Sequence, residues 1–432
     1  MKRPFLTPSH RLPVLCELGI PLFPFAPGWG AALLGVQLIM LVKSLGKSTF
    51  RHPVAWVLGA VSGWLFIVTA IAAYPLESFL GLANFIPFFL FFLAFSTLFN
   101  SLERLERLAW LFVAPSLGVS ALGLGELWFG WQTPVFISQL FGWGLTSVGN
   151  PPGRLASTFL YANICAAYLL MTLLLGLGLW LKDFSWAKLT KSKVFIYLTV
   201  TLLLDGVALI LTSSRSVWAI ALLGILIYAL YIGWWWICAA AGGFTAAVLG
   251  ASFGRSPWRE GLQQVVPYYF WGRLSDQMYG DRPVEFLRIT QWRFVFEMIG
   301  DRPLTGWGLR SFTPAYEAAM NTWLGHPHNF YLMLISEIGI PFGILLIAMV
   351  GWVLARGVLA WRYLRSNPKR IVLFSYLVTF GGYSLFNLLD VTSLDIRLNT
   401  FAWIILAGIW GLGQQVNHAG DEGQSYGSPE EY

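Results

Sequence analysis

The chain has 432 residues, of which 56% are hydrophobic, 16% aromatic and 11% charged. A soluble domain is about a quarter charged, so this composition excludes an ordinary soluble protein and indicates a polytopic membrane protein. The net charge of +7 gives no case for nucleic-acid binding, because Lys and Arg gather on the cytoplasmic side of membrane proteins.

The first 43 residues are expected to begin the membrane domain. Residues 1–25 lack the pattern of a cleaved signal peptide. Residues 12–43 are long for one helix and short for two, and helix-breaking residues interrupt them. These residues favour a hairpin of two short helices: Pro21, Pro24, Pro27 and Gly28.

Ten further apolar runs are long enough to cross about 30 Å of hydrocarbon. They lie at roughly 53–74, 78–99, 107–129, 155–181, 194–212, 216–231, 232–251, 328–356, 370–389 and 398–414. With the hairpin the count is twelve, and eleven is the alternative. We therefore expect an all-α fold of 11–12 transmembrane helices. The three cysteines all lie in apolar stretches without metal-ligand spacing, so neither a disulfide nor a metal site is expected: Cys16, Cys165 and Cys238.

Basic residues set the orientation of these helices, since they mark the cytoplasmic loops. They cluster at Lys43, Lys47 and Arg51, at Lys182, Lys188, Lys191 and Lys193, and at Arg356, Arg362, Arg365, Lys369 and Arg370. This threading predicts an N-terminal transmembrane bundle (1–251), a large periplasmic loop (252–327), C-terminal transmembrane helices (328–414) and a disordered cytoplasmic tail (415–432).

The loop 252–327 holds eight Arg, no Lys and many aromatic residues. A loop of this size and apolar content is expected to fold against the membrane domain. Guanidinium groups bind phosphate with two parallel hydrogen bonds, which favours a phosphate site. The alternative is that Lys is excluded from exported loops and that the Arg side chains pair with local acids. Composition leaves both open.

Five basic residues are expected at the outer boundary of the membrane: Arg154, Arg215, Arg288, Arg310 and His328. Such a cluster suits an anionic headgroup, most simply a phosphate or diphosphate, with a proton acceptor beside it. For Arg154 alone, an interfacial anchor is an equal alternative. Arg215 favours function, because it breaks the positive-inside bias in a turn too short to leave the membrane region.

The other candidates receive supporting roles. Asn163 is expected to make a hydrogen bond between helices. His326 and His328 form a weak metal pair, because no third His or Cys lies near them in the sequence. On one regular helix Glu337 would lie half a turn out of phase with His328 and about 13 Å deeper. We therefore assign proton transfer to His328 and a structural role to Glu337.

These residues resemble the O-antigen ligase and polymerase superfamily of membrane glycosyltransferases. The family signature H-N-x-x-L-x-x-x-x-E-x-G-x-x-G is matched by His328, Asn329, Glu337, Gly339 and Gly343, the last glycine being one position late. The stretch from Pro303 to Gly308, with Phe312 and Tyr316, looks like P-L-x-G-x-G-x-x-x-F, and Arg288 with Trp292 stands where the family has R-x-x-x-W.

Two N-terminal motifs extend the resemblance to about residues 150–410. Ser214-Arg215 matches the S-R turn of the family. The stretch from Arg154 to Phe159, followed by Asn163, looks like R-x-x-G-T-F…P-N. Ser157 replaces the Gly and Ala162 the Pro, so the start of that helix departs from the family pattern.

The resemblance implies a GT-C-like, multi-pass enzyme of the bacterial inner membrane that needs neither a metal nor another cofactor. It would move a glycan from undecaprenyl diphosphate to a hydroxyl at the periplasmic face, with inversion. Arg215 and Arg288, assisted by Arg154 or Arg310, would bind the donor diphosphate. His328 would take the proton from the acceptor hydroxyl.

Several alternatives stay open at this point. The acceptor is lipid A-core in a ligase, another repeat unit in a polymerase, or a protein hydroxyl in an O-oligosaccharyltransferase. Similar photosynthetic-bacterial proteins are associated with inorganic carbon uptake, so a transporter of bicarbonate or another anion is a second class. A membrane scaffold is a third class, and it gives no reason for the S-R turn.

Overall fold

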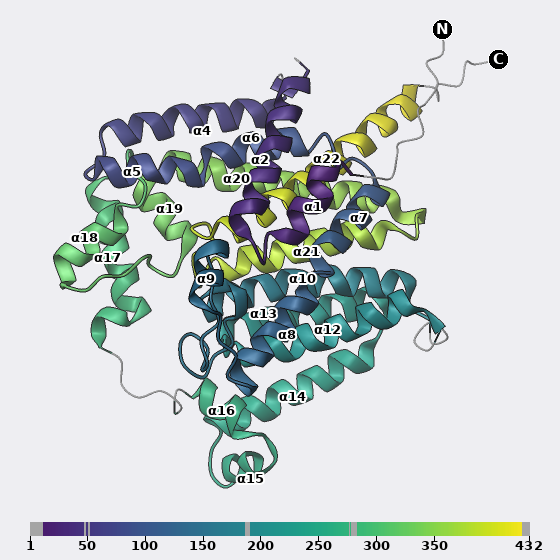
Figure 1. Ribbon diagram of the computed structural model, residues 1–432, viewed down its shortest axis with the longest axis vertical. Helices are drawn as coiled ribbons and strands as arrows, with labels where there is room; N and C mark the ends of the chain where they lie inside the picture. Colours follow the sequence, from purple (N-terminus) through teal and green to yellow (C-terminus); the bar gives the residue numbers. More distant parts are fainter. Residues whose placement is uncertain are drawn as a thin grey trace.

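The computed structural model describes residues 12–46, 49–50, 52–185, 191–275, 277 and 283–425. Over these residues every regular element is a helix, which confirms the all-α membrane fold (Figure 1). Ten helices or helix pairs are long and apolar enough to cross a membrane. They are α2 (Pro27–Ser44), α4 (Pro53–Ala70), α5 with α6 (Pro75–Gly81, Ile86–Phe95), α7 with α8 (Leu102–Val113, Ser116–Trp128), α10 (Ala162–Asp183), α12 (Lys193–Leu211), α13 (Arg215–Ile232), α14 (Trp235–Phe253), α20 (Ile340–Tyr363) and α22 (Ile396–Ser425).

The N-terminal hairpin forms, but its two helices are unequal. Helix α1 (Val14–Leu22) has 9 residues and α2 has 18. A crossing needs about 20 apolar residues, so α1 is too short to count as one. The ten candidates and the shorter helix α21 (Arg370–Phe386) favour the alternative of eleven crossings within the described residues.

Helix α10 lies at the centre of the bundle and packs against α7, α12, α13 and α21. It is apolar on all sides, and most of its residues are buried. Over Ile396–Val416 helix α22 is also mostly buried, whereas few residues of α14 are buried. The starts of α10 and α13 and the ends of α12 and α21 gather where the functional candidates lie.

The predicted helix over 328–356 is broken, and this corrects the sequence interpretation. Helix α19 (Phe330–Ile338) and helix α20 (Ile340–Tyr363) are separated by Gly339, which caps both. Gly339 has a φ of +83°, and a Cβ there would lie 2.1 Å from the carbonyl oxygen of Leu304. Only glycine permits this close approach of two backbones. The break therefore lets the loop before Gly306 pack against the helix end.

The large loop predicted over 252–327 contains its own helices: α15 (Trp258–Val265), α16 (Tyr268–Leu274), the 3-10 turn η3 (Val284–Phe286), α17 (Arg288–Asp301) and α18 (Phe312–Met320). Side chains of α17 and α18 form a small second core around Tyr316 and Val295. In Figure 1 these two helices lie beside α19, and α17 packs against it. The loop therefore folds against the membrane domain, as its composition predicts.

The C-terminal end differs from the prediction of a disordered tail. Helix α22 continues to Ser425, so the backbone of residues 415–425 is helical. Residues 426–432 lie outside the described residues.

Candidate functional site

A polar cavity of about 330 Å³ opens where the N-terminal ends of α10, α13 and α17 meet the C-terminal end of α21. The structure brings together five of the residues predicted from the sequence, Arg154, Asn163, Arg215, Arg288 and His328. It adds two charged residues to the lining, Arg273 and Asp390. Four guanidinium groups and one carboxylate line the cavity, so its charge favours an anion.

His328 lies against Asp390, which the sequence reasoning did not single out. The Nδ1 atom of His328 is 3.3 Å from Oδ1 of Asp390, and the carboxylate is buried. In the neutral ring a proton on Nδ1 is donated to Asp390, and this leaves Nε2 as the proton acceptor. The backbone of His328 has a φ of +51°, an uncommon conformation for a non-glycine residue and one that concentrates at functional sites.

His326 completes the group around Asp390. The backbone N–H of His328 donates to Nδ1 of His326 at 3.3 Å, so the proton of the neutral His326 ring is on Nε2. That Nε2 lies 3.6 Å from Oδ1 of Asp390. Burial lowers the pKa of His326 to about 4, although the charge of Asp390 raises it. His326 is therefore neutral at neutral pH.

Asp390 stays ionised despite its burial. Burial raises the pKa of this carboxyl, but the hydrogen bond from His328 and the charges of His326 and His328 outweigh burial and lower the pKa to about 2. An ionised carboxylate beside the ring stabilises the imidazolium that forms when His328 accepts a proton.

The donor atoms of His326, His328 and Asp390 all lie within 4.8 Å of one another. Two imidazoles and a carboxylate are a ligand set that suits a divalent transition metal. The sequence argument against a metal was that no third ligand lies near the two histidines, and the fold supplies one from a distant turn. The metal-free mechanism therefore stays a prediction.

A chain of hydrogen bonds connects Asp390 to Arg154. Nδ2 of Asn163 donates to Oδ2 of Asp390 at 2.7 Å, and Oδ1 of Asn163 accepts from Nη2 of Arg154 at 2.6 Å. Nε of Arg154 donates to the carbonyl oxygen of Thr212 at 2.8 Å, next to the turn that precedes Arg215. Asn163 thus joins α10 to the turn after α21 and fixes the direction of Asp390.

Glu126 holds the loop that carries Arg154. This residue is fully buried near the end of α8. Its Oε2 accepts the backbone N–H groups of Ala156 at 3.1 Å and Ser157 at 2.8 Å, and its Oε1 accepts that of Thr146 at 3.0 Å. The sequence signal was available, since an ionisable residue within an apolar run is costly unless it has partners.

The side chains of Arg215 and Arg273 each donate a hydrogen bond to a backbone carbonyl oxygen at or near the other residue. Nη1 of Arg215 donates to the carbonyl oxygen of Arg273 at 3.2 Å, and Nε of Arg273 donates to that of Ser213 at 3.2 Å. Ser213 has a φ of +52°. Arg273 is almost fully buried, and no sequence motif distinguishes it from the other arginines of its loop.

Arg288 begins α17, and Trp292 anchors that helix to the loop that carries His326 and His328 (the histidine loop). The indole Nε1 of Trp292 donates to the carbonyl oxygen of Pro327 at 3.0 Å, one residue before His328. The R-x-x-x-W spacing places the two side chains one helical turn apart. The pair therefore connects the arginine side of the cavity with the histidine side.

Three predicted residues lie outside the lining of this cavity. Nη2 of Arg310 donates to Oδ1 of Asn84 at 2.6 Å. Glu337 is buried with its carboxyl group beside the backbone N–H groups of Arg310 and Phe312. Oδ1 of Asn329 accepts from the backbone N–H of Leu332 at 3.0 Å and caps α19. These three side chains therefore have contacts within the fold and do not line the cavity.

Comparison with known proteins matches part of the chain to a described family. No protein of curated function matched the chain. Residues 200–348 match the family model described as O-antigen ligase, and this range contains Arg215, Arg273, Arg288 and His328. The matched stretch is similar to the O-antigen ligase family, in agreement with the resemblance that the sequence motifs indicate.

Proposed function

We propose that this protein transfers a glycan from undecaprenyl diphosphate to an acceptor hydroxyl at the periplasmic face of the bacterial inner membrane. The family match supports a glycosyltransferase of the ligase or polymerase type. The observation that carries the finer proposal is the His328–Asp390 pair, which lies in the same cavity as four arginines. A base beside an anion site is the arrangement that transfer from a diphosphate carrier requires.

The arginines bind the donor in this proposal. A lipid diphosphate carries negative charges that planar guanidinium groups bind with two parallel hydrogen bonds. Arg215 and Arg288 bind the diphosphate, and Arg154 and Arg273 contribute charge from the other walls of the cavity. Arg273 replaces Arg310 in this role, because Arg310 is held by Asn84 away from the cavity lining.

His328 acts on the acceptor. As the acceptor oxygen forms its bond to the anomeric carbon, the bond from that carbon to the diphosphate oxygen breaks, and the configuration inverts. The acceptor proton passes to Nε2 of His328, while the leaving diphosphate takes the electron pair and is stabilised by the arginines. Asp390 holds the ring with Nδ1 protonated and balances the positive charge that develops.

The test measures donor binding and glycan transfer separately, in purified protein with an undecaprenyl diphosphate-linked glycan. His328→Ala is expected to lower turnover by about 10² to 10⁴ and to leave donor binding intact. Arg288→Ala is expected to weaken donor binding as well. If His328→Ala transfers glycan at the normal rate, the histidine has no part in the mechanism. Anion uptake without transfer would instead support the transporter alternative.

A further inference from the structure

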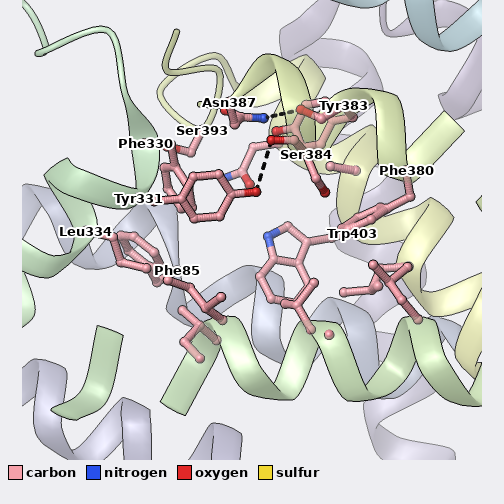
Figure 2. Close-up of a pocket in the computed structure, with 18 of the residues that line it drawn as sticks. Phe85, Phe330, Tyr331, Leu334, Phe380, Tyr383, Ser384, Asn387, Ser393 and Trp403 are labelled. Atoms are coloured by element: carbon pink, nitrogen blue, oxygen red, sulfur yellow. Dashed lines mark hydrogen bonds between the residues drawn. The ribbon is translucent and has the colours of Figure 1, made fainter. Parts of the chain in front are cut away.

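A second cavity, of about 230 Å³, lies inside the bundle between the residues just before α6 and the helices α19, α20, α21 and α22 (Figure 2). It shares no lining residue with the polar cavity lined by Arg154, Arg215, Arg273 and Arg288 (the arginine cavity). Among the residues that the structure describes, those that line it are uncharged, and most are apolar or aromatic. In Figure 2 Phe85, Leu334, Phe380 and Trp403 surround its interior. The cavity therefore offers no charge to a headgroup.

Several of the polar side chains that line this cavity already have hydrogen-bond partners. The hydroxyl of Tyr331 donates to the carbonyl oxygen of Ser384 at 3.1 Å, and Nδ2 of Asn387 donates to that of Tyr383 at 2.9 Å. Nδ2 of Asn399 donates to the carbonyl oxygen of Asn84 at 2.9 Å. A water molecule needs two to four polar partners, so the interior favours an apolar guest.

The cavity borders a second, apolar groove on the lipid-facing side of α13, α20 and α21. Tyr331, Ile347 and Ser384 line both spaces. Leu385 and Leu388 of the outer groove are 41% and 44% exposed, so this groove faces the hydrocarbon of the bilayer. Tyr331 and Ser384 thus stand between the bilayer and the inner cavity, at the point where a lipid chain would enter.

We propose that the inner cavity binds one acyl chain of a bilayer lipid, which enters beside Tyr331. Cavities of about 150 Å³ lined by Leu, Ile and Phe bind benzene, so a larger cavity of the same chemistry holds an apolar guest. The guest here comes from the bilayer, because the cavity borders a groove that lipid covers. An unbranched acyl chain is narrower than an isoprenoid chain, which carries a methyl group on every fourth carbon, and this favours the acyl chain.

The bound chain supports the wall that carries the histidine. The backbone N–H of Phe330 donates to the carbonyl oxygen of Asn387 at 2.8 Å, so the segments after His328 and before Asp390 are joined there. Phe330 and Asn387 line the inner cavity, whereas His328 and Asp390 line the arginine cavity. One wall therefore separates the two spaces. The lipid site goes beyond the proposed glycan transfer and does not depend on it.

Two glycines give a matched pair of variants. Gly351 lines the inner cavity and Gly381 the outer groove, and a Cβ added at either meets no atom within 4 Å. The backbone therefore has room for a side chain at both positions. Gly351→Leu is expected to take up part of the inner cavity, and Gly381→Leu part of the groove. The probe is a phosphatidylcholine with a diazirine on one acyl chain, in nanodiscs of ordinary phosphatidylcholine that contain the full-length protein. Adducts are mapped by peptide mass spectrometry.

The wild type is expected to carry adducts on residues of the inner cavity such as Trp403 and Leu334. Gly351→Leu is expected to reduce these adducts about tenfold, because added side-chain volume excludes the chain, while adducts at Leu388 persist. Gly381→Leu is expected to reduce the adducts at Leu388 more than Gly351→Leu does. Absence of inner adducts in the wild type, or an equal yield in Gly351→Leu, would overturn the proposal. So would inner adducts that form only with a diazirine-labelled polyprenyl phosphate. No outcome requires glycan transfer to be measured.

Discussion

Oδ1 of Asp390 lies 3.3 Å from Nδ1 of His328, although 62 residues separate them in the chain. The contact brings a buried carboxylate from the turn after α21 to a histidine that precedes α19. Because Asn163 holds the other oxygen of Asp390 at 2.7 Å, the carboxylate has a fixed direction. Asp390 thus determines which nitrogen of His328 is available to accept a proton.

The first prediction concerns this tautomer. Asp390→Asn is expected to lower turnover by about 10² to 10⁴, because an amide donates to Nδ1 and leaves the proton on Nε2. Donor binding is expected to stay close to that of the wild type. Transfer rate and donor affinity, measured on the same preparation, check both parts. A variant with normal turnover would show that Asp390 does not orient the base.

The second prediction concerns Glu126 and the loop that it holds. Glu126→Gln is expected to weaken donor binding about tenfold, because an amide has one acceptor oxygen where the carboxylate serves three backbone N–H groups. The effect should act through Arg154. In a double-mutant cycle, Glu126→Gln is therefore expected to add little to Arg154→Ala. Fully additive losses would contradict a role in positioning Arg154.

The third prediction compares two arginines of different position. Arg215→Lys is expected to lose most transfer activity, because an ammonium group cannot make the two parallel hydrogen bonds that a planar guanidinium makes to a phosphate. Arg310→Lys is expected to keep donor binding and to lower the melting temperature, because its guanidinium contacts Asn84 and lies outside the cavity lining. Isothermal donor binding and thermal melts of both variants separate these outcomes. If both variants lose donor binding to the same extent, Arg310 also binds the donor.

The fourth prediction is a pH dependence of stability. The folded state holds the pKa of His326 at about 4, below its ordinary value of 6.5, chiefly because the ring is buried. Between these values the unfolded chain binds a proton that the folded chain does not, so stability is present above pH 6.5 and falls toward pH 4. His326→Asn is expected to flatten this slope in melts recorded across that range. If the slope is unchanged in His326→Asn, other groups cause the pH dependence of stability.

Much of the architecture could be predicted from residue periodicity and charge. Apolar runs predicted most of the crossings, because a helix in lipid must be apolar over its length. The break at Gly339 was missed because the apolar run continues through it. The reason for the break is a tertiary contact, since the backbone of Leu304 approaches where a side chain would otherwise stand.

The site could be predicted in part for a similar reason. Arg154, Arg215 and His328 lie at predicted outer ends of helices and Arg288 lies in the predicted outer loop, so topology alone brought them to one face. Asp390 lies at the end of another apolar run, and nothing in the sequence pairs it with His328. Arg310 belongs to the same loop as Arg288, but its backbone has a φ of +57° and its guanidinium contacts Asn84. Local spacing does not determine either contact.

The most direct test of the central claim is the anomeric configuration of the transfer product, formed in the presence of a strong chelator. Purified protein in liposomes receives an undecaprenyl diphosphate-linked glycan and a hydroxyl acceptor, and nuclear magnetic resonance of the product reports the new linkage. We predict full transfer in the chelator and an inverted configuration, because arginines neutralise the leaving diphosphate and His328 takes the proton in one displacement. A retained configuration, or activity that is lost in the chelator and restored by zinc through the His326, His328 and Asp390 group, would contradict the account.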